Sequence, residues 1–161
     1  VQERKAKKAA EAANAKAEII TDNEGNAVAT KATFASGILF PTSGFTLSAA
    51  AQNDLRTFAA NLDADLDISV YGFTDNTPFK NKTAEQSKEE NLKLSQKRAQ
   101  AVKDFLSVNG FSAARFKEVS GFGESNPVGD NSTAAGKELN RRVEVYIFPS
   151  EALIKQAQQA Q

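Results

Sequence analysis

The chain has 161 residues, enough for one compact domain with some additional length and too few for two full domains. Its 20 Lys and Arg residues balance 20 Asp and Glu residues, and this net charge of zero predicts no general attraction to nucleic acid or anionic lipid. Cys and His are absent, which excludes a disulfide framework, thiol catalysis and the commonest general base, and we expect neither a metal nor a cofactor.

Residues 1–18 are rich in Ala, Lys and Glu and predict a helical linker. The segment has almost no apolar stripe, so we expect a solvated helix, with the end of a longer spacer as the alternative. Because the chain starts at Val1 without an initiator Met, we expect a longer protein whose membrane anchor lies outside this sequence. Residues 19–36 predict a small β-hairpin, because two short apolar runs flank the turn-rich segment 22–26.

Residues 37–149 predict the main domain. The expected elements are a helix from Ser48 to Asn61, a strand from Asp65 to Thr74, a helix from Thr83 to Val108, a strand from Phe116 to Gly121, a long loop from Gly123 to Asn140, and a strand from Arg142 to Phe148. Strands and helices alternate from residue 38 to 121, which predicts βαβ units in two layers. The last strand follows a loop, so we expect it to pair antiparallel. The predicted fold class is therefore α+β, βαβαββ with a mixed sheet, followed by a tail at 150–161 that is a short helix or disordered.

Two patterns define these elements most sharply. The strand 65–74 places Leu66, Ile68 and Val70 on one face and polar residues on the other, as is typical of a half-buried strand. Thr83 and Gln86 have the spacing of a capping box and predict where the long helix begins.

The chemistry of the domain is expected at the carboxyl end of the strand 65–74, where Asp75 follows immediately. Alone, Asp75 is also compatible with a turn that ends the strand, and Arg98 with an exposed charge on the second helix. A helix of about 25 residues spans about 37 Å, whereas a nine-residue strand spans about 30 Å. Arg98 lies about 15 Å from the helix end at Val108, so it is placed within reach of the sheet edge near Asp75.

Four sequence blocks carry a family resemblance. They are Gly72-Phe-Thr-Asp-Asn-Thr77, Asn91-Leu-Lys-Leu-Ser-Gln-Lys-Arg-Ala-Gln-Ala-Val102, Gly121-Phe-Gly-Glu-Ser-Asn-Pro127 and Asn140-Arg-Arg-Val-Glu144. In this order, over residues 37 to 148, they resemble the OmpA C-terminal-like family, which includes peptidoglycan-associated lipoproteins and the periplasmic parts of flagellar stators. The resemblance implies a non-enzymatic domain that binds peptidoglycan non-covalently in the periplasm of a Gram-negative bacterium. It also implies attachment to the outer membrane through an anchor.

The resemblance also implies the ligand contacts. Asp75 and Arg98 match the family's residues that hold diaminopimelate of the stem peptide, whose side chain ends in an ammonium and a carboxylate. The backbone around Thr74 and Asn76 is expected to add N–H donors. The remaining candidates are Asn91, Arg141 and Arg142, and strand parity puts Arg141 on the side of Val143 and Arg142 on the opposite side.

Two positions depart from the family pattern. Phe73 stands where many members have His, so this ring donates no hydrogen bond. The segment from Asp75 to Asn91 is longer than usual, and its excess, Pro78 to about Glu90, predicts either a longer helix or a lid over the site.

Three functions remain open from the sequence. The first is the peptidoglycan-binding anchor, and the second is an interaction, oligomerisation or stator-type module that uses the helix 1–18 for assembly. The third is a glycosidase with Asp75 and Glu124 as paired carboxylates, for which the sequence sets no separation. The oligomeric state is not predicted, because the helix 1–18 has no heptad seam.

Overall fold

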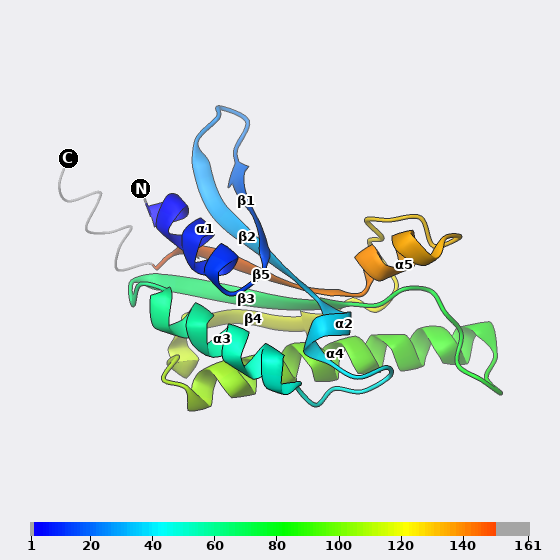
Figure 1. Cartoon of the computed structure of the whole chain (residues 1–161). Coiled ribbons are helices and arrows are strands. Elements are labelled where there is room, and N and C mark those ends of the chain that lie inside the picture. The colour runs from blue at the N-terminus through cyan, green and yellow to red at the C-terminus, as the bar shows by residue number, and fades with distance from the viewer. Residues whose placement is uncertain (1, 151–161) are drawn as a thin grey trace.

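The computed structural model describes residues 2–150, and within them five strands form one mixed sheet in the order β1-β2-β5-β3-β4. The helical elements are α1 (Gln2–Ala12), α2 (Ser36–Leu39), α3 (Ala49–Asn61), α4 (Ala84–Val108), the 3₁₀ turn η1 (Ala113–Arg115) and α5 (Ala134–Asn140). The strands are β1 (Lys16–Thr21), β2 (Ala27–Ala35), β3 (Leu66–Phe73), β4 (Phe116–Gly121) and β5 (Arg142–Pro149). Strands β3 and β4 run parallel, and every other neighbouring pair is antiparallel. Figure 1 shows α3 and α4 running along the sheet. The α+β class and the mixed sheet are confirmed, and β5 pairs antiparallel as expected.

The predicted hairpin is part of the main sheet and not a separate unit. Strand β2 pairs with β5 from Thr30 opposite Ile147 to Ala35 opposite Arg142. Ala32 and Phe34 point into the core, where the Phe34 ring meets the edge of Phe58 of α3 at 5.7 Å between centroids. Strands β1 and β2 therefore belong to the sheet of the domain, and the segment expected to start the alternation near residue 38 is the short helix α2.

Helix α1 is packed against the sheet, so the expectation of a solvated helix was wrong. Ala6, Ala9, Ala10 and Ala13 are all buried, and their helical spacing puts them on one face. This face contacts β1, β2 and α3. Alanine buries little apolar area, but it allows close packing, so a face of alanines is sufficient here. Because this face is covered within the chain, it is not available for assembly with another protein.

The central elements formed where the sequence predicts them. The Ser48 side chain caps α3, and Thr83 and Gln86 form the capping box that starts α4. Strand β3 is more buried than predicted, since Asp67 and Ser69 on its polar side are each only 5% exposed. The loop expected from Gly123 to Asn140 contains an unpredicted helix, α5, which Thr133 caps through a hydrogen bond from the Gly136 N–H. The tail beyond residue 150 lies outside the described residues.

Two glycines bring α4 onto the sheet. A Cβ atom on Gly72 of β3 would lie 2.3 Å from the Ser95 carbonyl oxygen, and one on Gly121 of β4 would lie 2.2 Å from the Gln96 nitrogen. Only residues without a side chain allow this approach. The Ser95 hydroxyl also accepts a hydrogen bond from the Gly123 N–H at 2.9 Å. These contacts fix the height and rotation of α4 one turn before Arg98.

Candidate functional site

A cavity of about 580 Å³ lies at the carboxyl end of β3. Its walls come from α2 and the loop that follows it, the segment after β3, the middle of α4 and the residue before β5. Five of the seven predicted site residues line it, namely Thr74, Asp75, Asn91, Arg98 and Arg141. Segments far apart in the sequence therefore converge on one cavity, as the length comparison of strand and helix predicts.

Asp75 supplies the only carboxylate among the residues that line this cavity. It is 7% exposed, and its two oxygens have different partners: the Thr77 N–H donates to Oδ1 at 2.8 Å, and Arg141 Nη1 donates to Oδ2 at 2.5 Å. Burial is the largest single influence and raises the pKa of the Asp75 carboxyl, but the Thr77 and Arg141 hydrogen bonds outweigh it and hold the pKa below its ordinary value of 3.8. Asp75 is therefore an anion at neutral pH.

Arg98 is buried, at 5% exposure, and neutral groups hold it in place. Its Nε donates to the Gly44 carbonyl at 2.8 Å and its Nη2 to the Pro41 carbonyl at 3.4 Å, while the guanidinium carbon lies 5.1 Å from the centre of the Phe40 ring. Within residues 2–150, no carboxylate forms an ion pair with Arg98. Burial and then the charge of Arg141 lower the pKa of Arg98, whereas the charge of Asp75 raises it, so the three charges act on one another across the cavity.

These charges determine which ligand the cavity can bind. Two guanidinium groups and one carboxylate line it, a surplus of one positive charge. Asp75 already has a cation, whereas Arg98 is held in place but pairs with no anion in the described part of the chain. The arrangement favours a ligand that carries at least one carboxylate for Arg98.

Thr74 and Asn91 support the loop next to Asp75. The Thr74 N–H is already bonded to the Gly123 carbonyl at 2.8 Å, so it is not the free backbone donor that the sequence suggests. Asn91 donates to the Thr77 carbonyl at 3.3 Å and thereby ties the loop to α4.

The long segment Pro78–Glu90 has two parts. Residues 84–90 extend α4, which projects past the sheet in Figure 1. Pro78 and Phe79 line the cavity, and the Phe79 N–H donates to the Ser87 hydroxyl at 2.8 Å. The extra residues therefore lengthen the helix and form one wall of the cavity.

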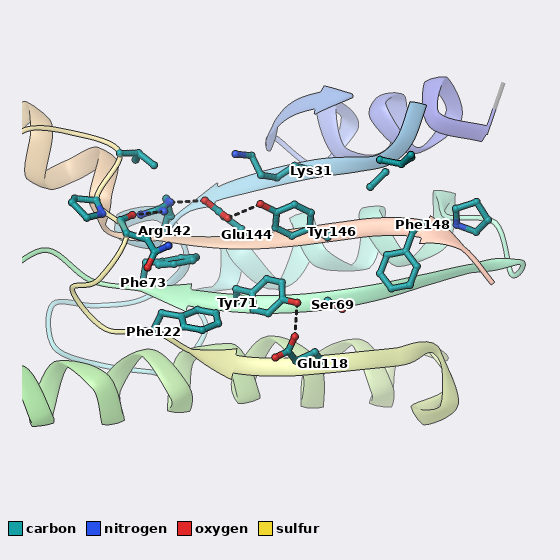
Figure 2. A pocket seen from close by; sticks show the side chains of 16 residues that line it. Lys31, Ser69, Tyr71, Phe73, Glu118, Phe122, Arg142, Glu144, Tyr146 and Phe148 are labelled. Carbon is teal, nitrogen blue, oxygen red and sulfur yellow. Dashed lines mark hydrogen bonds and ion pairs between the residues drawn. The ribbon is translucent and has the colours of Figure 1, made fainter. Parts of the chain in front are cut away.

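Asn76 and Arg142 do not line the cavity. Asn76 is exposed on the loop that follows β3. Arg142 points to the opposite face of the sheet, where its Nε donates to Glu144 at 2.7 Å and its guanidinium carbon lies 3.9 Å from the centre of the Phe73 ring (Figure 2). Phe73 thus forms a stacking surface for Arg142. This is the position at which many family members have His.

Two residues around the cavity were not identified from the sequence. Asn140 is fully buried, and its Oδ1 accepts from the Val128 and Gly129 N–H groups at 2.7 Å each. Asn140 thereby fixes the loop that leads to α5. The one sequence feature that could have identified it is its position directly before Arg141 and Arg142. Lys137 of α5 donates to the Thr77 hydroxyl at 2.9 Å, which joins α5 to the Asp75 loop.

The enzymatic alternative has no geometric support. Glu124, the second carboxylate of the glycosidase hypothesis, lines neither this cavity nor the groove on the other face of the sheet. In the described part of the chain, no group of three or more Asp or Glu residues is placed to hold a metal ion. Nor does any described helix have the length and apolar character to cross a membrane.

Comparisons with known proteins agree with this architecture. The chain is 35% identical over 116 residues to the probable lipoprotein YiaD of Escherichia coli, covering 71% of this chain and 49% of YiaD. It is 34% identical over 112 residues to the peptidoglycan-binding protein ArfA of Mycobacterium tuberculosis, covering 68% of this chain and 32% of ArfA. The chain thus spans half or less of the length of these two relatives.

A solved structure shows the same fold. The cell wall anchor of the T6SS from Pseudomonas aeruginosa superimposes with a TM-score of 0.72 at 28% identity, covering 93% of this chain and 98% of that one. The model of the OmpA family matches residues 39–141, which contain all five of the predicted site residues that line the cavity. The chain is therefore a member of the OmpA family.

Proposed function

We propose that this chain binds peptidoglycan non-covalently by holding the diaminopimelate residue of a stem peptide in the cavity of Asp75 and Arg98. The observation that carries the proposal is that both side chains line one cavity while Arg98, although buried, has no carboxylate partner within residues 2–150. A buried guanidinium without an anion is costly unless a ligand supplies one.

Diaminopimelate supplies the complementary groups. Its side chain ends in a carboxylate and an ammonium on one carbon atom. Arg98 can hold the carboxylate with N–H groups that are not directed at the Pro41 and Gly44 carbonyls. The ammonium is placed against Asp75, where it shares the carboxylate with Arg141. Arg141 can also contact the ligand carboxylate, because its side chain is 39% exposed.

The relatives support the class of ligand. ArfA is named as a peptidoglycan-binding protein, and the structural neighbour from Pseudomonas aeruginosa is a cell wall anchor. We infer the same class of partner for this chain and a periplasmic location, with attachment to the outer membrane through a part of the protein outside this sequence. We infer binding without catalysis, since none of the three relatives is named for a reaction.

Sedimentation with purified peptidoglycan sacculi tests this proposal. Wild-type protein is expected to sediment with sacculi, and Asp75→Ala and Arg98→Ala are each expected to remain in the supernatant. Removing one member of a desolvated charge pair typically costs about 2–5 kcal/mol, which lowers affinity at least tenfold. Asp104→Ala and Arg56→Ala are matched controls, because both side chains are exposed and line neither cavity. Equal sedimentation of all five proteins would reject the site.

A further inference from the structure

The face of the sheet opposite α3 and α4 carries a second concave site, a groove of about 1000 Å³. Side chains alternate along strands, so the β3 residues Ser69, Tyr71 and Phe73 point to this face, while Gly72 faces α4. On β5, Glu144 and Tyr146 point the same way (Figure 2). The volume of the groove is at the upper end of the range of typical ligand sites. The groove is separate from the Asp75 cavity, so the proposed function gives it no role.

Aromatic rings form the floor of the groove. Tyr71 lies 5.6 Å from Tyr146 and 5.4 Å from Phe122 between ring centres, and Phe122 stacks on Phe73 at 5.6 Å. Phe122 is 39% exposed, and both tyrosines are partly exposed. Phe73 itself is 6% exposed and supports Phe122 from below. Phe122, Tyr71 and Tyr146 therefore present the accessible ring surface, whose negative centre attracts the partly positive C–H groups of a ligand.

Carboxylates and hydroxyls surround this floor. The Tyr71 hydroxyl donates to Glu118 at 2.6 Å, and the Tyr146 hydroxyl donates to Glu144 at 3.3 Å. Glu144 is 5% exposed and is also paired with Arg142 at 2.7 Å, so the accessible carboxylate is that of Glu118, which is exposed and has further lone pairs that can accept hydrogen bonds from a ligand. The charged residues that line the groove are Lys31, Glu118, Arg142 and Glu144. Their charges cancel, so the groove favours a neutral ligand, in contrast to the cavity of Asp75.

A saccharide has these properties, because it is neutral and combines C–H faces with many hydrogen-bond donors. We propose that this groove binds the amino-sugar backbone of the glycan strand whose stem peptide occupies the Asp75 cavity, an inference that rests on the proposed function. When its lactyl carboxylate is joined to the peptide, each repeating unit of that backbone has no charge, and its hydroxyl and acetamido N–H groups can donate to Glu118, the exposed carboxylate of the groove.

One end of the groove lies next to the cavity. Phe73, the last residue of β3, lines the groove, and Asp75, two residues later, lines the cavity; Arg142, the first residue of β5, lines the groove, and Arg141 before it lines the cavity. The three residues from Phe73 to Asp75 span about 10 Å when extended, which is similar to the distance between two packed layers of a protein. One polymer can thus place its peptide branch on one side of this edge and its sugars on the other.

Tyrosine fluorescence gives a direct readout of the groove. The chain has two Tyr residues and no Trp, and both Tyr71 and Tyr146 line the groove. Titration of the full chain with chitotetraose, a neutral tetramer of N-acetylglucosamine without peptide, is expected to change the tyrosine emission saturably. Maltotetraose is the matched neutral saccharide without acetamido groups and is expected to bind at least tenfold more weakly.

Variants separate this inference from the proposed function. By calorimetry, Tyr146→Ala is expected to lower affinity for chitotetraose at least tenfold and to leave binding of a diaminopimelate tripeptide unchanged, whereas Asp75→Asn is expected to do the reverse. Circular dichroism checks that both variants fold. Unchanged tyrosine emission up to the solubility limit of chitotetraose, equal binding of maltotetraose, or full chitotetraose affinity in Tyr146→Ala would each overturn the proposal, whatever the result with the tripeptide.

Discussion

Asp75 forms an ion pair with Arg141, with 2.5 Å between Oδ2 and Nη1. This pair keeps the buried carboxylate charged and oriented. It also leaves Arg98, on α4, as the cation in the cavity that has no anionic partner within the described residues. Within residues 2–150 the site therefore contains one carboxylate with a cationic partner and one guanidinium without an anionic partner, and we propose that a ligand carboxylate supplies that partner.

The pH dependence of binding follows from the lowered pKa of Asp75. Its carboxyl stays ionised until the pH falls below its ordinary value of 3.8, so affinity for a diaminopimelate tripeptide is expected to be constant from about pH 5 to pH 7 and to fall only in stronger acid. The sign for folding is the same, because a lowered pKa stabilises the folded state above the unfolded-state pKa and this contribution is lost as pH falls through the folded-state pKa. Calorimetric titration of the tripeptide, from pH 7 down to the acid range in which affinity is lost, measures this dependence. A midpoint above pH 5 would contradict the assignment to Asp75.

The close approach of α4 to the sheet predicts a strong effect at Gly121. In Gly121→Ala the new methyl group would overlap backbone atoms of α4, and such overpacking typically costs about 1–3 kcal/mol of unfolding free energy. The displaced helix also carries Arg98 away, so affinity for the tripeptide is expected to fall. The control is Gly37→Ala, since nothing lies within 4 Å of a Cβ atom there. Urea unfolding compares the two, and equal stability would show that α4 does not pack as closely as described.

The alanine face of α1 predicts that a charged substitution lowers thermal stability at a buried position of this helix and not at an exposed one. Ala10 is fully buried, whereas Ala12 is exposed. An uncompensated buried charge costs roughly 3–5 kcal/mol, so Ala10→Glu is expected to lower the thermal midpoint strongly or to detach α1, while Ala12→Glu changes little. Calorimetric melting measures both variants. If their midpoints coincide, α1 is not part of the core.

Local signals allowed the sequence to predict several elements closely. The capping box of Thr83 and Gln86 set the start of α4, and alternation of apolar residues located β3 and β5. The parity of Arg141 and Arg142 also correctly placed them on opposite faces. Each of these depends on residues close together in the chain.

Other features depend on distant contacts and were missed. The pairing of β2 with β5 joins Ala35 to Arg142, and no local pattern reports such a pairing. The apolar face of α1 consists of alanines, whose weak hydrophobicity makes the stripe hard to see among lysines. The partner of Asp75 is Arg141, 66 residues away, so this ion pair was also beyond sequence reasoning.

The most direct test of the central claim compares two tripeptides that differ by one carboxylate. L-Ala-γ-D-Glu-meso-diaminopimelate and the same peptide with L-Lys as its third residue are titrated into wild-type protein and Arg98→Gln by calorimetry. Because Arg98 is the cation assigned to that carboxylate, wild-type protein is expected to prefer the diaminopimelate peptide at least tenfold, and Arg98→Gln is expected to lose the preference. Equal affinity of wild-type protein for both peptides, or an undiminished preference in Arg98→Gln, would contradict the account.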